Sequence, residues 1–226
     1  MKTTVFVLTN PACDVRDGQF QIADYAYTVP SLPAYAILHH ALSFDLSIPI
    51  ETGIQHQPYT IEGDKVVLSG RSIAGLSLID RVTLTIGYSG VRDYALLFPH
   101  IQNEKLRSRL GWFAEEAERT FDASAWMSFV LMAGAVIEGL LTVRFYGDNG
   151  PNRNRDGKVD FYRLIKRAGE SGLLSEGECE NVDSVREARN TVHADRYESP
   201  FVDRKLAMDT YLVYDRLLKR RWDLDD

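Results

Sequence analysis

The spacing of hydrophobic positions along the chain changes near Gln102 and Asn103. Before this point, short runs rich in β-branched and aromatic residues predict strands separated by turns. Gly63-Asp64 predicts a hairpin turn, and the apolar positions of residues 33–43 predict one helix. The predicted strands are residues 3–8, 20–29, 59–62, 66–68, 82–87 and 94–98. Residues 1–102 are therefore expected to form a β-rich or α+β domain.

After Asn103 the hydrophobic period becomes that of an α-helix. The first apolar stripe consists of Leu106, Leu110, Phe113, Ala114, Ala117 and Phe121. It is followed by residues 123–145, which are apolar around the whole helix, with Asp122 or Ser124 as the expected N-cap and an end near Gly147. A helix that is apolar on all sides is typical of the centre of a helical bundle.

Further helices are predicted after this central one. The first of them covers residues 159–168. Ser175 and Glu178 have the spacing of a capping box, and the helix they open has apolar positions as far as Val192. Ser199-Pro200 is a typical N-cap and N1 pair for the last helix, which runs towards Trp222. We therefore expect an α+β protein, in which a β-rich domain at 1–102 precedes an all-α bundle of four or five helices at 103–226.

Composition and motifs restrict the classes of function that the sequence allows. Among 226 residues, 26 Lys and Arg stand against 32 Asp and Glu, and the net charge of −6 gives no overall attraction to nucleic acid or anionic lipid. The two cysteines lack the spacing of a disulfide framework or a zinc site. Gly-rich phosphate loops, a Gly-x-Ser-x-Gly elbow and His-Glu-x-x-His are also missing from the sequence. The lack of these motifs disfavours kinases, dehydrogenases, serine hydrolases and zinc proteases. We expect no metal and no cofactor.

Residues 123–145 are long enough to span a membrane. Glu138 lies within this run, however, and an acid near the bilayer centre costs on the order of 2.5–3.5 kcal/mol. The flanks also lack a Lys/Arg asymmetry. We favour a buried core helix over a membrane span. Because the apolar stretch at the amino terminus is too short for a signal peptide, we expect a cytoplasmic protein with no membrane partner.

One polar stretch of the fourth predicted helix concentrates residues suited to phosphate chemistry. On a continuous helix, Arg186, Asn190 and His193 stand at i, i+4 and i+7, and Arg189 lies one turn before His193. When RNA is cleaved without a metal, a base removes the 2′-hydroxyl proton, an acid protonates the leaving 5′-oxygen and a cation stabilises the phosphorane. Histidine suits the proton transfers and arginine suits the phosphate oxygens.

An alternative explains the same residues without catalysis. Arg186 or Arg189 pairs with Glu138 or Asp183, and His193 terminates the helix, where a cation favours the negative end of the dipole.

A second group of cations could hold an RNA backbone. Arg153, Arg155 and Lys158 lie in a loop rich in Gly, Pro and Asn, ahead of further cations on the next helix. Together they would form a local basic patch despite the acidic total. A solvated loop and helix face is the favoured explanation of the same residues.

The helical half resembles the HEPN superfamily. The resemblance rests on Ile137-Glu138-Gly139-Leu140-Leu141 in the central helix and on the run from Val185 to Ala194 before the final helix. It implies an α-helical bundle, and many members are metal-independent ribonucleases in which two Arg/His motifs of a homodimer form one cleft. Such members often act in toxin–antitoxin or antiviral defence. Other members have lost the activity and serve as binding or dimerisation modules.

Carried onto this chain, the resemblance leaves two registers open. Arg186, with six residues before His193, fits the outer limit of the family spacing. Arg189 has only three intervening residues but is followed by Asn190, which matches the polar residue that often follows the family arginine. Glu138 would correspond to the acid of the central helix that faces the motif. In this interpretation RNA is the substrate, and residues 1–102 recognise a protein partner or target.

Overall fold

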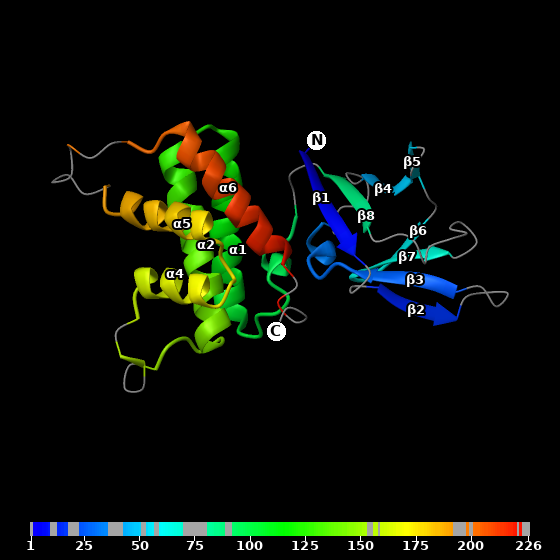
Figure 1. The fold of residues 1–226 in the computed structure, drawn as a ribbon, viewed down its shortest axis with the longest axis horizontal. Helices are drawn as coiled ribbons and strands as arrows, with labels where there is room; N and C mark the ends of the chain where they lie inside the picture. Colours follow the sequence, from blue (N-terminus) through cyan, green and yellow to red (C-terminus); the bar gives the residue numbers. More distant parts are fainter. Residues whose placement is uncertain are drawn as a thin grey trace. The chain divides into compact units, whose positions relative to one another are not determined.

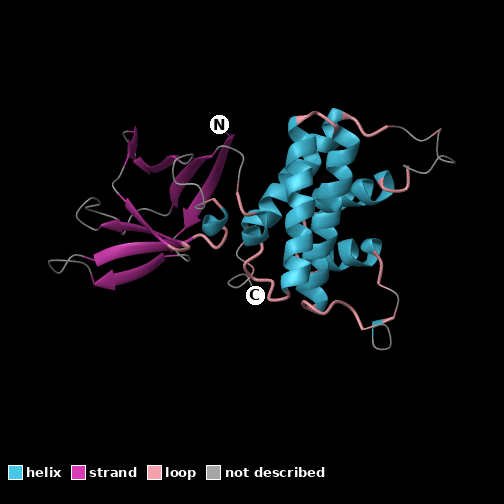
Figure 2. Ribbon diagram, turned by 180° about the vertical axis from the view of Figure 1, so that it is seen from behind, coloured by secondary structure: helices cyan, strands magenta, loops and turns pink. Residues whose placement is uncertain are grey.

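The computed structural model describes residues 2–9, 13–17, 23–35, 43–50, 53–56, 59–69, 81–88, 92–152, 156–157, 159–191, 198, 201–220 and 222. The chain divides into two compact units, Met1–Leu97 with Arg221–Asp226, and Phe98–Arg220 (Figure 1). The first contains the strands and the second the long helices (Figure 2). The predicted α+β class is confirmed. The boundary lies a few residues before the predicted one because Phe98 and Ile101 are fully buried within the helical unit.

The first unit contains two antiparallel sheets among the residues that the structure describes. One has the order β1-β8-β4-β5 and the other the order β2-β3-β7-β6. The strands are β1 Lys2–Thr9, β2 Cys13–Asp17, β3 Ala23–Thr28, β4 Ser43–Ile50, β5 Gly53–His56, β6 Tyr59–Glu62, β7 Lys65–Ser69 and β8 Arg81–Tyr88. The sequence pattern missed β2, β4 and β5. The predicted hairpin turn is confirmed: Glu62 pairs with Lys65 around Gly63, whose φ of +62° favours glycine.

Alternation along β1 places the core of the first unit. Phe6 and Leu8 are buried, whereas Val5 and Val7 between them are exposed. Phe6 pairs with Leu84 of β8, which is also buried. One face of the β1–β8 pair therefore packs inward, as the period of two requires.

Two predictions in the first unit are wrong. Residues 94–98 form a 3-10 helix, η7 Tyr94–Leu97, instead of a strand, because the Asp93 carboxylate accepts a hydrogen bond from the Ala95 N–H at 3.0 Å and turns the chain. The α-helix expected at 33–43 is also wrong at both of its predicted ends. Leu32–Ala34 is a short 3-10 helix, η3, and Ser43 begins β4, while residues 36–42 lie outside the described part.

The helices of the second unit begin mostly at side-chain caps. They are α1 Glu104–Asp122, α2 Trp126–Tyr146, α4 Phe161–Glu170, α5 Glu176–Ala188 and α6 Arg204–Lys219. Asn103, Asp160, Ser175 and Asp203 cap α1, α4, α5 and α6. The capping box of Ser175 and Glu178 is confirmed.

Two predicted helix starts are wrong. Neither Asp122 nor Ser124 caps α2: Ala125 holds that position without a side-chain bond. Asp122 instead completes α1, and Ser124 has a φ of +57°, which ends the first helix sharply before the second begins. The last helix begins after Asp203, later than the Ser199-Pro200 start, which lies outside the described residues.

Helix α2 is the central element of the second unit, in contact with α1, α4, α5 and α6. Its predicted end at Gly147 is confirmed. By length and composition α2 could cross a membrane, and 44% of its most apolar window is buried within the fold. That the protein has no membrane partner stays a prediction.

Two glycines let other helices approach α2 closely. A Cβ atom at Gly134 would lie 2.6 Å from Val185 Cγ1 of α5, and one at Gly139 would lie 2.5 Å from Leu110 Cδ2 of α1. Helices α4 and α5 lie beside each other and cross α2 (Figure 1). The missing side chain at Gly134 therefore sets how near α5 comes to the central helix.

Candidate functional site

An ion pair joins the end of α5 to the middle of α2. Arg189 Nη1 donates a hydrogen bond to Glu138 Oε2. Glu138 lies one turn after Gly134, and Arg189 lies one turn after Val185, so the close helix crossing brings the two charges together. The side chains are 40% and 32% exposed for Arg189 and Glu138, so the pair remains open to solvent.

The neighbouring arginine is held by acids of its own helix. Arg186 Nε donates to Asp183 Oδ1 at 2.6 Å, and Arg186 Nη2 donates to Glu187 Oε1 at 3.3 Å. The hydrogen bond to Asp183 raises the pKa of Arg186, and the nearby carboxylates add to this effect. Both arginines are thus paired with a carboxylate, Arg186 with Asp183 and Arg189 with Glu138, as in the ion-pair alternative that the sequence left open.

Both guanidinium groups also lie over aromatic rings at the start of α4. Arg186 Cζ is 5.6 Å from the centre of the Tyr162 ring, and Arg189 Cζ is 5.7 Å from the centre of the Phe161 ring. Phe161 is buried, whereas Tyr162 is 55% exposed. These distances fit cation–π contacts. The end of α5 and the first turn of α4 therefore form one surface, which we call the arginine–tyrosine surface: Glu138, Tyr162, Arg186 and Arg189.

The helix that carries the arginines ends earlier than predicted. Its last residue is Ala188, and Arg189 is the C-cap. The Ala188 carbonyl accepts hydrogen bonds from both the N–H and the hydroxyl of Thr191, at 3.1 and 2.8 Å, which replaces the next helical hydrogen bond by a turn. The assumption of one helix as far as His193 is therefore wrong.

The early end also changes the position of Asn190. Its N–H donates to the Glu187 carbonyl at 2.8 Å, and the residue is exposed in the turn after the helix. Asn190 is adjacent in sequence to the Arg189 of the ion pair and lies in the turn that follows α5. Helical spacing is observed as far as the C-cap Arg189, and His193 lies outside the described residues.

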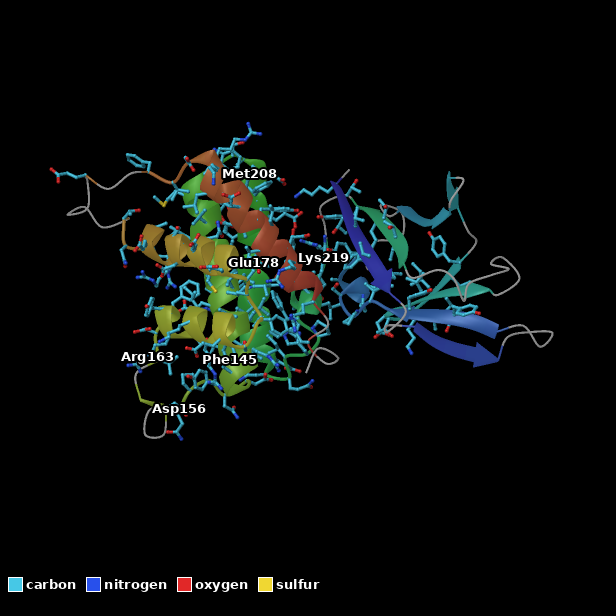
Figure 3. All side chains as sticks on the ribbon, in the orientation of Figure 1. Phe145, Asp156, Arg163, Glu178, Met208 and Lys219 are labelled. Carbon is cyan, nitrogen blue, oxygen red and sulfur yellow. The ribbon has the colours of Figure 1, made fainter. Side chains whose placement is uncertain are left out.

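Several candidate residues lie outside the described part of the chain. They are His193 of the motif and Arg153, Arg155 and Lys158 of the proposed RNA-binding loop. The cations that follow this loop are described. Arg163, Lys166 and Arg167 are exposed on α4, and Figure 3 shows Arg163 near the start of that helix, towards the segment that carries Asp156.

Two of the α4 cations have a carboxylate or an aromatic ring beside them. Lys166 Nζ lies 3.9 Å from Glu170 Oε1. Arg167 Cζ lies 4.6 Å from the centre of the Phe145 ring, at the end of α2. The arginine–tyrosine surface likewise contains acids beside its cations. The described residues of this region therefore carry charge of both signs and do not form a uniformly basic patch.

Tyr162 was not among the residues that the sequence singled out. It follows Phe161, which packs inward, and precedes Arg163 on the polar side of α4. The signal available in the sequence was an aromatic residue on the outward side of an amphipathic helix. Its contact with Arg186 depends on the antiparallel pairing of α4 and α5, which local spacing does not give.

A separate groove lies at the opposite end of α5. Its volume is about 770 Å³, and its walls come from the α4–α5 turn, the start of α5, and α6. Glu178 and Arg216 form an ion pair in its wall, with 2.6 Å between Oε1 and Nε. The groove contains none of the residues predicted for catalysis.

The described residues include no group of three His, Cys, Asp or Glu side chains arranged to hold a metal ion. Comparisons with protein-family models, with curated proteins and with solved structures give no match for this chain.

Proposed function

We propose that this protein is a HEPN-like, metal-independent endoribonuclease that acts through the end of α5. The observation that carries the proposal is the Glu138–Arg189 ion pair, which fixes a solvent-accessible guanidinium beside Arg186. Two guanidinium groups at one helix end suit the non-bridging oxygens of a phosphodiester. Glu138 orients Arg189 from the central helix, in the role that the resemblance gives to its acid.

The reaction assigns a role to each motif residue. His193 acts as the general base or acid: a proton leaves the ribose 2′-hydroxyl, whose oxygen attacks phosphorus, and the 5′-oxygen leaves with a proton. Arg186 and Arg189 stabilise the charge of the phosphorane, and Asn190 positions the phosphate. The products are a 2′,3′-cyclic phosphate and a free 5′-hydroxyl. Because the attacking group is the 2′-hydroxyl, DNA is not a substrate.

The same proposal covers the oligomeric state, the partners and the biological role of the protein. We propose a homodimer, since two motifs brought together by a two-fold axis would form one cleft. Residues 1–102 would recognise a protein partner or target, Arg153, Arg155 and Lys158 would contact the RNA backbone, and the protein would act in the cytoplasm, in a defence or toxin–antitoxin system.

The test is cleavage of end-labelled single-stranded RNA in EDTA by the wild type, His193→Ala and Arg189→Ala. We expect wild-type cleavage with 2′,3′-cyclic phosphate ends, no cleavage by His193→Ala, and a loss of at least about 100-fold for Arg189→Ala. Arg119→Ala is the matched control, because Arg119 is also an exposed, ion-paired arginine at the end of a helix and should leave the rate unchanged. Equal cleavage by wild type and His193→Ala would refute the mechanism.

A second candidate is a non-catalytic binding or dimerisation module. The observation that favours it is the occupancy of Arg186 by Asp183 and Glu187, since an arginine that already has two carboxylates must exchange them for a phosphate. In this case the wild type would cleave no RNA under the conditions above, and Asp183→Asn would lower the stability of the helix end.

A further inference from the structure

We propose that Tyr162 is the stacking platform for one base of single-stranded RNA at the arginine–tyrosine surface. The inference rests on the proposed function in one respect only: RNA is the ligand class. Tyr162 would be a positioning residue that places a nucleotide beside Arg186 and Arg189. It would act by binding and would take no part in the proton transfers.

The exposure of Tyr162 is the first argument. The neighbouring Phe161 fills the core position of this turn of α4, whereas the Tyr162 ring is 55% exposed. An exposed ring beside the Arg186 guanidinium presents a π-face on which any unpaired base can stack.

The position of Arg186 is the second argument. Its guanidinium carbon lies 5.6 Å from the centre of the Tyr162 ring, at the distance of a cation–π contact. The guanidinium thus lies beside the ring, and a base stacked on the exposed ring would have this cation next to it. The phosphate attached to that nucleotide would then lie within reach of Arg186, which draws it towards Arg189.

The balance of charge decides which kind of binding is expected. The cations near the ring, Arg186 and Arg189, have Asp183 and Glu138 beside them, and Lys166 has Glu170. Asp160 adds a further negative charge, which acts on Arg186. Because acids accompany the cations, stacking should supply more of the affinity than phosphate attraction. Such a site prefers unstacked bases over a duplex.

The experiment measures binding apart from cleavage. A fluorescein-labelled 2′-O-methyl oligoribonucleotide of about twelve residues cannot be cleaved, since its 2′-oxygen has no proton to lose, and is titrated with full-length protein by fluorescence anisotropy. The variants are Tyr162→Phe, which keeps the ring, and Tyr162→Ala, which removes it. Trp112→Ala is the matched control, because Trp112 is a 70% exposed aromatic residue on α1. Circular dichroism and thermal unfolding establish that every variant is folded.

We expect Tyr162→Ala to weaken binding at least about 10-fold, while Tyr162→Phe stays within about twofold of the wild type. Trp112→Ala should bind like the wild type. The duplex form of the same oligonucleotide should bind more weakly than the single strand. The loss caused by Tyr162→Ala should be about the same at low and high salt, because stacking, unlike phosphate contact, releases no counterions.

Three results would overturn the proposal: equal binding by wild type and Tyr162→Ala, equal binding of single strand and duplex, or no wild-type binding at all. Different results would refute the proposed ribonuclease activity. If the wild type does not cleave RNA but its binding depends on the Tyr162 ring, the catalytic mechanism is wrong and the stacking site stands. If the wild type cleaves RNA and Tyr162→Ala cleaves and binds it equally well, the mechanism stands and the stacking site is wrong.

Discussion

Glu178 links two helices through one carboxylate. Its Oε2 accepts a hydrogen bond from the Ser175 N–H at 2.8 Å, closing the capping box of α5, and its Oε1 accepts one from Arg216 Nε of α6 at 2.6 Å. Partial burial is the largest single influence on the pKa of Glu178 and raises it, but the hydrogen bonds from Ser175 and Arg216 together outweigh it. The pKa therefore lies below its ordinary value.

This lowered pKa predicts how stability depends on pH. Because the folded-state pKa is below the unfolded one, the charged carboxylate contributes stability above the unfolded value and loses it as pH falls through the folded value. Glu178→Gln, which can still cap α5, should lower the free energy of unfolding by about 1 kcal/mol or less at about pH 7, since both side chains are partly exposed. Urea unfolding at about pH 7 and about pH 3 should show this difference shrinking on acidification.

The control for this residue is Glu176→Gln, in the same first turn of α5. It removes an acid from the helix N-terminus without removing the Arg216 pair. A difference between wild type and Glu178→Gln that is the same at both pH values would contradict the role assigned to the ionised carboxylate.

At the scale of elements, the sequence predicts what neighbouring residues decide. The capping box of Ser175 and Glu178 and the turn at Gly63 depend on hydrogen bonds and φ angles within a few residues, and both are observed. The early end of α5 also has a local cause, in the hydroxyl of Thr191, but an apolar pattern that continues to Val192 concealed it. Helical spacing alone gives no weight to such a competing hydrogen bond.

The candidate site was predictable only in part for the same reason. The sequence offered Arg186 or Arg189 as partners of Glu138 or Asp183, and the structure selects Arg186 with Asp183, three residues apart, and Arg189 with Glu138, 51 residues apart. The second choice depends on which face of α2 meets α5. That face is set by Gly134, whose closeness to Val185 is a property of tertiary packing.

The crossing at Gly134 makes a prediction about α2. Gly134→Ala would place a Cβ atom 2.6 Å from the branched side chain of Val185, which has little freedom to move. Overpacking of this kind costs about 1–3 kcal/mol and exceeds the gain of up to about 1 kcal/mol in helix propensity. We expect Gly134→Ala to lower the free energy of unfolding in urea by about 1–2 kcal/mol.

Gly139→Ala is the matched control within the same helix. Its added methyl would meet Leu110, a buried side chain with Cδ2 at 2.5 Å, so we expect a loss of stability smaller than that of Gly134→Ala, because leucine has more χ1 freedom than the β-branched valine. A Gly134→Ala protein at least as stable as the wild type would show that α5 can move away from α2 without cost.

At the scale of the whole molecule, the strand order of the first unit was beyond the sequence pattern. Strand β8 pairs with both β1 and β4, so the middle of one sheet is formed by segments far apart in the chain. The spacing of residues within a strand predicts which face is buried, but not which strands become neighbours. Strand β4 shows a related limit, because it contains Pro49, which argues against a strand when only the sequence is considered.

The proposed dimer makes a prediction for the assembled protein. If two copies form one cleft, the cleavage rate per chain should rise with protein concentration in parallel with the dimer fraction, measured by sedimentation. Adding excess His193→Ala protein to the wild type should lower the activity per wild-type chain, because mixed dimers hold only one complete motif. Full activity in sedimentation-defined monomers would contradict a shared cleft.

The central position of α2 also has a consequence during synthesis. Helix α1 leaves the ribosome first and can cover one side of α2 at once. Glu138 in the middle of α2 has no Arg189 to pair with until another 51 residues have been synthesised. At a translation rate of about 5–20 residues per second, this delay is roughly 3–10 s. For that time a helix long and apolar enough for a bilayer is only partly covered, and Glu138 is the charge near its middle that opposes transfer into lipid.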